Sequence, residues 1–330
     1  MKKILPVFLT FLFSHQAIYS QTTENTGNPV TEIFTDFHYN LNDSTKTTGF
    51  GMNRAYLGYK YTPGGNYSAL LILNVGTPED LAAGSVPKRY AFFREASVTY
   101  TQENLTLSFG MVSTRYENYQ QGFWGKRYLG SEYQALYGYG SVADLGVVVD
   151  YKFNDIFKVD FSLLNGKGYT SIKADNSLKS AVGFTITTPD NLAVRLYTDI
   201  YHPGGAWQST NIAFAGFKNK LFSLGVEGSY KTSLDLTKGH DVWGLSSTGS
   251  IFLNEKSEIF VRYDYASSVK VSGEALSWDC VKDATYFIGG FQRTLSNNLK
   301  LALNYRITDP HFPGKKTTDA IYLNARFSFL

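Results

Sequence analysis

Cysteine, proline and long apolar runs are all scarce in this sequence of 330 residues, which holds nine Pro and the single cysteine Cys280. One cysteine excludes a secreted domain that is held together by its own disulfides. Beyond the first 20 residues, no apolar stretch approaches the roughly 20 residues that a membrane-spanning helix needs. Both disulfide-stapled domains and helical membrane proteins are therefore excluded, and we interpret Cys280 as a passive loop thiol.

A strong charge of either sign is also missing. Lys and Arg number 31 against 28 Asp and Glu, which gives a formal net charge of +3. Removal of Lys2 and Lys3 would lower it to +1. Domains that bind nucleic acid carry a pronounced basic surplus, so we expect no nucleic-acid partner.

The first 20 residues have the anatomy of a secretory signal peptide. A basic head, Met1-Lys2-Lys3, precedes an apolar run from Ile4 to Phe13 and a more polar tail. This order of segments is typical of export signals. We expect residues 1–20 to be removed and residues 21–330, beginning near Gln21, to form one domain.

Aromatic residues and glycine are abundant, with 24 Tyr, 24 Phe and 30 Gly. Apolar and polar residues alternate in about sixteen segments, as they do along strands whose two faces meet different environments. One such segment alternates Leu192, Val194 and Leu196 with Ala193, Arg195 and Tyr197. The apolar faces often end in Tyr or Phe, which matches the aromatic girdles of outer-membrane barrels.

The connections between these segments alternate between short and long. Seven short turns, such as Pro63-Gly64-Gly65-Asn66 and Asn154-Asp155, contain residues that tight hairpins use. Eight long loops lie between them, near 40–48, 76–89, 113–142, 165–178, 202–209, 232–241, 266–282 and 308–318. Outer-membrane barrels have short periplasmic turns and longer external loops. The sequence therefore predicts an all-β fold, a transmembrane antiparallel β-barrel of about 16 strands.

Two segments leave the strand number open. Ile33 to Leu41 carries Phe34, Asp36 and His38 on its nominally inner face, and residues 283–294 alternate ambiguously. Fourteen strands therefore stay an alternative to sixteen. A closed barrel of either size satisfies the edge strands in lipid.

The chain ends in a strand pattern, with Ile321, Leu323, Ala325, Phe327 and Phe329 on one face. A last strand with aromatics on its lipid face is similar to the strand that the barrel-assembly machinery recognises. We therefore expect this machinery, the lipid bilayer and lipopolysaccharide as partners, and the outer membrane of a Gram-negative bacterium as the location.

Three stretches resemble a known family. Gly51 to Tyr59 is similar to an early strand of the phosphate-selective porin O and P family, and Phe123 to Tyr128 with Tyr139 to Gly146 resembles the third loop and sixth strand of that broad group. The resemblance implies a sixteen-stranded porin that forms a homotrimer. The long loop over 113–142 follows the fifth segment, where porins usually fold a loop into the barrel, and it is rich in aromatic residues, so we expect it to narrow the pore. An external cap or a trimer contact is the alternative.

Charged residues with aromatic neighbours in and near this loop are the candidates for the pore constriction, because guanidinium groups hold oxyanions by paired hydrogen bonds. The candidates are Arg54, Arg115, Lys126, Arg127, Tyr116, Tyr128, Glu117 and Glu132. Residues on the polar faces of other strands are expected to line the pore, namely Lys60, Arg195, Arg262, Arg306 and Asp264. Fixed charges around a pore set its ion selectivity.

These patterns favour a porin for ions and small hydrophilic solutes, with a weak preference for anions. An outer-membrane lipase or protease, with a site among loop residues such as His202 or His240, is the alternative, and a structural or secretion-associated barrel is a third. No nucleophile elbow, zinc-ligand cluster or phosphate loop accompanies the histidines. We therefore expect no catalytic residue, no metal and no cofactor, although Asp43, Asp175 and Asp241 leave external calcium open.

Overall fold

The structure is a computed structural model that describes residues 25–42, 47–75, 91–171 and 175–329. The predicted signal peptide, Asp43 and the whole predicted loop over 76–89 lie outside the described residues. Their interpretation stays a prediction.

The described residues form sixteen antiparallel strands that close into one barrel, in which each strand pairs with its neighbours in the sequence and β1 pairs with β16. The sixteen-strand prediction is therefore confirmed, and fourteen strands are excluded. The strands are β1 (Thr26–Asn40), β2 (Thr48–Thr62), β3 (Tyr67–Val75), β4 (Ala91–Gln102), β5 (Leu105–Ser113), β6 (Ala143–Lys152), β7 (Phe157–Leu164), β8 (Lys179–Thr187), β9 (Leu192–Tyr201), β10 (Gln208–Lys218), β11 (Phe222–Thr232), β12 (Val242–Asn254), β13 (Ser257–Ser268), β14 (Ala284–Ser296), β15 (Leu299–Pro310) and β16 (Thr318–Phe329).

The two faces of the wall differ as the alternation predicts. On β9, Leu192 and Leu196 are exposed on the outer face, whereas Arg195 and Asp199 are buried on the inner face. The segment that reads ambiguously from sequence is β14, where Ile288 is fully buried and Phe291 is exposed. Apolar side chains thus form the outer wall, and polar side chains turn into the barrel.

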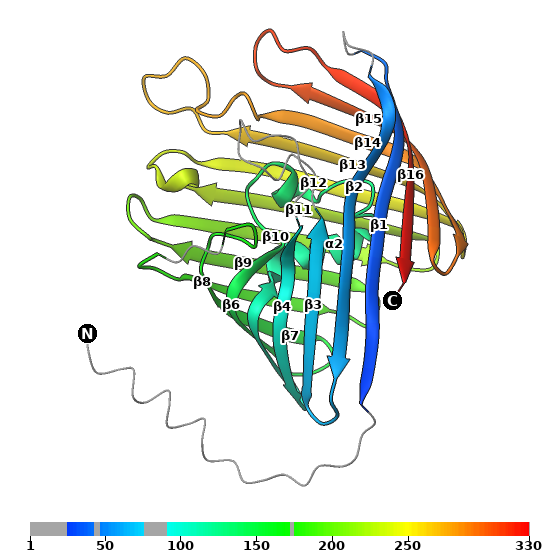
Figure 1. The fold of residues 1–330 in the computed structure, drawn as a ribbon. Coiled ribbons are helices and arrows are strands. Elements are labelled where there is room, and N and C mark those ends of the chain that lie inside the picture. Colours follow the sequence, from blue (N-terminus) through cyan, green and yellow to red (C-terminus); the bar gives the residue numbers. More distant parts are fainter. Residues whose placement is uncertain (1–24, 43–46, 76–90, 172–174, 330) are drawn as a thin grey trace.

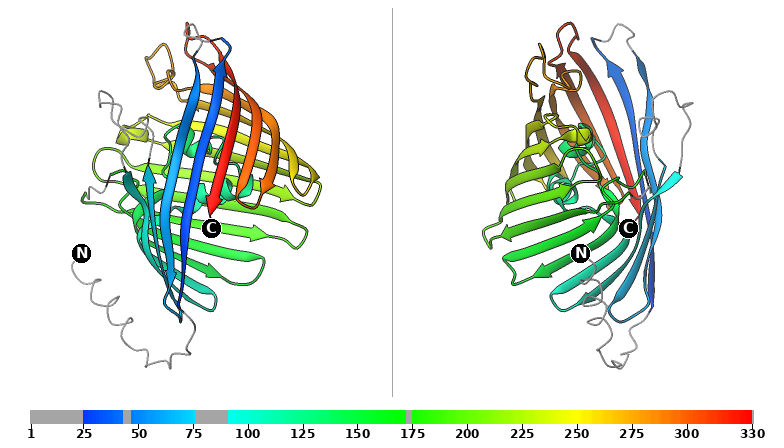
Figure 2. Two further views of the ribbon diagram at one scale, coloured as in Figure 1. Left: turned by 45° about the vertical axis from the view of Figure 1, so that its right-hand side comes forward. Right: turned by 90° about the vertical axis from the view of Figure 1, so that its left-hand side faces the viewer.

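The inserted loop, residues 114–142, lies inside the barrel. It contains two helices, α2 (Arg115–Trp124) and α3 (Tyr133–Leu136). Figure 1 shows α2 surrounded by strands, and both views of Figure 2 place the helices within the outline of the barrel. A further short helix, η2 (Leu234–Leu236), lies in the loop between β11 and β12. None of the described helices is long and apolar enough to cross a membrane.

Candidate functional site: a constriction beside the inserted loop

Two facing glycines on neighbouring strands let α2 pack closely against one side of the barrel. Gly216 on β10 and Gly225 on β11 face each other across the strand pair. A Cβ atom on Gly216 would lie 2.6 Å from the Phe123 ring, and one on Gly225 would lie 2.8 Å from it. Phe123 also packs edge-on against Phe214, with 5.0 Å between the ring centroids. The two glycines therefore make the space that the Phe123 ring fills.

The second half of the loop is fixed to the same side of the barrel by buried polar contacts. Gln134 donates from Nε2 to Oε1 of Glu227 at 2.7 Å, and Arg262 donates from Nη1 to the carbonyl of Ser131 at 2.6 Å. The Tyr133 hydroxyl occupies the space beside Gly244, where a Cβ would lie 1.8 Å from it. Inward glycines on three consecutive strands therefore position the loop.

Lys126 also fixes the loop to the wall. Its ammonium lies 2.8 Å from Oε2 of Glu258 on β13 and donates to Oγ of Ser250 at 2.9 Å. Burial lowers the pKa of Lys126. Next to it, the Tyr128 hydroxyl donates to Oε1 of Gln292 at 2.6 Å. Lys126 is thus paired with the wall.

On the other side of the loop lies a cavity of about 180 Å³ that we name the arginine pocket. The loop contributes one wall, and β1, β2, β4 and β16 contribute the other. The lining residues are Glu32, Phe34, Tyr56, Arg94, Gln121, Gly125, Arg127, Tyr128 and Arg326. Of the predicted constriction residues, the structure places Arg127 and Tyr128 in this pocket.

Each guanidinium group of the arginine pocket has one carboxylate within 4 Å, and two of these three ion pairs are long. Arg326 forms an ion pair with Glu32. Nε of Arg127 lies 3.6 Å from Oε2 of Glu132, and Nη1 of Arg94 lies 3.7 Å from Oε1 of Glu95. Nε of Arg94 is buried and has no hydrogen-bond partner within the described ranges. The lining surface itself therefore presents three guanidinium groups and one carboxylate, Glu32, to a passing anion, while Glu95 and Glu132 offset Arg94 and Arg127 from outside the lining.

Two buried carboxyl groups lie behind the arginine pocket. Glu117 is completely buried and Glu132 is 5% exposed. Burial, together with the neighbouring Glu132, raises the pKa of Glu117 well above its ordinary value. Burial also opposes the ionisation of Glu132, but Arg127 and the neighbouring Glu117 carboxyl hold the pKa of Glu132 below its ordinary value. Glu117 is therefore the protonated member of the pair and Glu132 the ionised one.

The remaining predicted constriction residues lie elsewhere. Arg115 makes two parallel hydrogen bonds to Asp150, at 2.8 and 2.7 Å, and is thereby fixed at the base of the loop. Arg54 donates to the Tyr169 hydroxyl at 3.3 Å. Tyr116 is buried and accepts a hydrogen bond from the main-chain N–H of Ser141 at 2.8 Å. These three residues do not line the arginine pocket.

The predicted lining residues form ion pairs and amide contacts on the inner face. Arg195 reaches Asp160 at 2.6 Å across Gly183, where a Cβ would lie 2.5 Å from the guanidinium. Arg262 pairs with Asp264, with Nε 2.9 Å from Oδ1. Arg306 donates to Asn304 and Asn324 at 2.8 and 2.7 Å. Lys60 is exposed near the rim of short turns.

Sequence reasoning missed Arg94 as a site residue, because a β-bulge interrupts the alternation there. In the β3–β4 pair, Ile72 faces Glu95 and Leu73 faces Phe93, so Arg94 is the extra residue. A bulge redirects side chains that strict alternation would place on the other face. Gln121 and Glu32 also went unnoticed. Gly216 and Gly225 could have predicted the position of the loop from sequence, since glycine within a strand often marks the close approach of another part of the chain.

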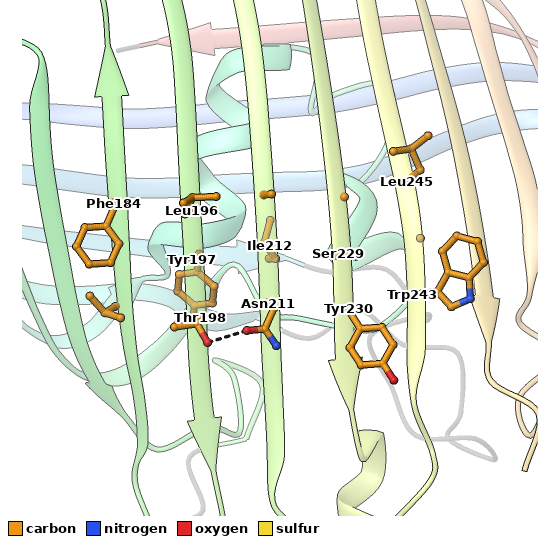
Figure 3. Close-up of a pocket in the computed structure, with 14 residues that line it drawn as sticks. Phe184, Leu196, Tyr197, Thr198, Asn211, Ile212, Ser229, Tyr230, Trp243 and Leu245 are labelled. Carbon is orange, nitrogen blue, oxygen red and sulfur yellow. Dashed lines mark hydrogen bonds between the residues drawn. The ribbon is translucent and has the colours of Figure 1, made fainter.

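A hollow of about 830 Å³ lies on the outer wall of β8 to β12, not in the lumen. Figure 3 shows its exposed aromatic residues, including Phe184, Tyr230 and Trp243, together with a hydrogen bond of 2.9 Å between Thr198 and Asn211. These side chains belong to the apolar outer face. The hollow is therefore part of the surface that would meet lipid.

Two of the loop histidines, His202 and His240, stack on tryptophans. His202 lies 4.4 Å from Trp207 and His240 lies 4.1 Å from Trp278 between ring centroids. Within the described ranges, no group of three His, Cys, Asp or Glu side chains could hold a metal ion. Asp241 accepts hydrogen bonds from Tyr230 and from the main chain of Ser233.

Comparison with known proteins identifies the architecture. No protein-family model and no curated protein matches the sequence, so the resemblance to the phosphate-selective family is not confirmed. Solved structures do match. The chain is similar to the outer membrane channel DcaP of Acinetobacter baumannii, with a TM-score of 0.65 and 14% identity over 95% of this chain and 100% of that one.

Two further structures have the same architecture. The anion-selective porin from Comamonas acidovorans matches with a TM-score of 0.65 and 10% identity, over 93% of this chain and 100% of that one. The trimer form of OmpT, an outer membrane protein of Vibrio cholerae, matches with a TM-score of 0.60 and 14% identity, over 93% of this chain and 100% of that one. The fold of this chain is therefore the sixteen-stranded barrel of outer-membrane porins and channels.

Proposed function

We propose that this protein is an outer-membrane porin through which ions and small hydrophilic solutes diffuse passively, with a weak preference for anions. The observation that carries the proposal is the arginine pocket, where three arginines and one glutamate line a cavity between the inserted loop and β1, β2, β4 and β16. The loop is packed against β10 and β11, and we infer that solutes pass on this opposite side.

The charges in the arginine pocket favour weak and transient binding of a permeating anion. A guanidinium group presents planar paired donors to a carboxylate or phosphate. Glu32, Glu95 and Glu132 offset part of the positive charge of Arg326, Arg94 and Arg127 respectively. Conduction requires binding that is favourable enough for entry and weak enough for exit. Partial neutralisation therefore favours weak selectivity over tight capture.

The comparisons support the wider setting of this proposal. One similar structure is described as an anion-selective porin and another as a trimer form. On this basis we propose a homotrimer in the outer membrane of a Gram-negative bacterium. We also propose that the barrel contacts lipopolysaccharide and that the barrel-assembly machinery recognises its last strand. Membership of the phosphate-selective porin family is part of the same proposal.

Conductance tests the pore directly. Purified protein in a planar lipid bilayer should give stepwise currents, and Gln121→Trp should reduce each step because an indole would fill the arginine pocket. Asn66→Trp makes a similar change at an exposed short turn and should leave the step unchanged. A folded barrel without steps would contradict the pore, and equal steps in both variants would contradict its location.

A further inference from the structure

A second cavity, of about 170 Å³, lies on the other side of the inserted loop, and we name it the lysine pocket. Its walls come from the base of the loop, from β6, β7, β8, β10 and β11, and from residues 166–168. Three lysines line it, Lys167, Lys179 and Lys231, with Asp144 as the one acidic lining residue of the described chain. It shares no lining residue with the arginine pocket.

Lys231 is a buried lysine without a carboxylate at ion-pair distance among the described residues. The residue is 7% exposed, and its ammonium donates to the main-chain carbonyl of Tyr139 at 2.7 Å. Across the part of the chain that the structure describes, no carboxylate lies within 4.0 Å of this ammonium. An ammonium has three donors, and a buried charge needs a partner of opposite sign. In its protonated form, Lys231 therefore has both the charge and the donors to hold an anion.

Two acidic groups around the pocket, Asp199 and Asp144, are occupied by other donors. Asp199 pairs with Lys179 at 2.8 Å and also accepts hydrogen bonds from the main-chain N–H of Thr210 and from the Tyr197 hydroxyl, both at 3.0 Å. Asp144 accepts hydrogen bonds from the main-chain N–H groups of Leu145 and Gly166, both at 2.8 Å. Their charge is therefore shared with groups other than Lys231.

Lys179 and Lys167 complete the basic surface. Lys179 is 8% exposed, and its ammonium lies 5.4 Å from the centroid of the Tyr116 ring. Lys167 is more accessible, and its ammonium lies 3.1 Å from Asp175. One water needs about 10–15 Å³ of cavity space. A volume of about 170 Å³ therefore has room for an oxyanion together with several waters.

We propose that the lysine pocket binds a small oxyanion of the carboxylate or sulfate class, with Lys231 as its principal partner and Lys179 as the second. The anion supplies the opposite charge for the protonated ammonium of Lys231. Through the contact of Lys231 with Tyr139, it also links the base of the inserted loop to β11. The site is separate from the constriction. It does not require that the arginine pocket conducts ions.

The test measures how the melting temperature of the purified full-length barrel depends on the anion. Sodium sulfate and sodium acetate are compared with sodium chloride at equal ionic strength. A ligand that binds the native state raises the melting temperature in a concentration-dependent way. Sulfate also stabilises proteins by exclusion from their surfaces, so the specific effect is the part that a pocket variant loses.

We expect a saturable rise for the wild type and at least a tenfold weaker apparent affinity for Lys231→Met. Lys231→Arg keeps the charge and should keep the binding, which separates loss of the ligand from loss of the fold. Lys300→Met removes the same charge from β15, outside the pocket, and should bind as the wild type does. An absent saturable rise in the wild type would overturn the site. An unchanged affinity in Lys231→Met, or an equal loss in Lys300→Met, would also overturn it.

If sulfate and acetate bind equally, the pocket accepts oxyanions as a class. If one of them binds alone, the site is specific for tetrahedral or for planar oxyanions. Conductance does not enter either readout. The melting experiment can therefore support the anion site even if the protein conducts no ions, and a conducting pore would not by itself support the anion site.

Discussion

Gly216 and Gly225 face each other across the β10–β11 pair, and the Phe123 ring fills the space that their missing side chains leave. This relationship decides which side of the lumen the inserted loop covers. The cavity lined by Arg94, Arg127 and Arg326 lies on the other side of the loop.

Gly225→Leu should displace the inserted loop. A Cβ at this position would lie 2.8 Å from the Phe123 ring, and overpacking of a fitted site costs about 1–3 kcal/mol. We expect larger and noisier single-channel steps in a planar bilayer. Gly228 lies three residues further along β11, and a Cβ there would meet nothing within 4 Å, so Gly228→Leu is the control. Wild-type conductance steps in both variants would show that the packing of Phe123 against Gly216 and Gly225 does not hold the loop in place.

The barrel could be predicted from sequence because its determinants are local. Alternation on β9, for example, sorts Leu196 outward and Arg195 inward without any knowledge of the neighbouring strands. The constriction depends on non-local geometry instead. Arg94 enters it through a bulge, and Lys126 turns from the loop to Glu258 on the wall. Strict period two describes neither the bulge nor the direction of a loop side chain.

Glu117 should make the stability of the docked loop depend on pH. Burial raises its pKa, so the folded state holds a proton that the unfolded state releases. The stabilisation is complete below the ordinary pKa of Glu and is lost as the pH rises through the raised pKa, at up to about 1.4 kcal/mol per pH unit. Thermal melting from pH 5 to pH 10 should show this decline in the wild type and a smaller decline in Glu117→Gln. Parallel curves would contradict the assignment of the proton to Glu117.

Leu71 lies in the middle of β3 and is exposed on the outer face. Arginine near the bilayer midplane costs about 2–4 kcal/mol in barrels of this kind. Leu71→Arg should therefore lower the free energy of unfolding in lipid vesicles by that amount. Thr106→Arg places the same side chain on the inner face of β5, opposite Asp150, and should cost little. Equal losses would contradict the assignment of the two faces.

Asp160 and Arg195 form a buried ion pair on the inner face, with the two side chains 9% and 3% exposed. Removal of one partner from such a pair costs about 3–5 kcal/mol, because the other charge stays buried and unpaired. Asp160→Asn should therefore lower the free energy of unfolding in denaturant titrations. Asp155→Asn breaks the exposed pair with Lys152 and should leave the unfolding midpoint unchanged. A shift that is no larger in Asp160→Asn than in Asp155→Asn would show that the inner pair is already solvated.

The central claim is that the arginine pocket sets the ion preference, and the reversal potential across a potassium chloride gradient tests it most directly. The wild type should show a small potential of the sign that corresponds to chloride permeation. Arg127→Glu and Arg94→Glu should each shift it toward potassium, because each replaces a positive charge in the pocket with a negative one. Arg293→Glu makes the same charge change on the exposed outer face and should keep the wild-type value. A wild-type pore that prefers potassium, or a potential that neither pocket variant moves, would contradict the claim.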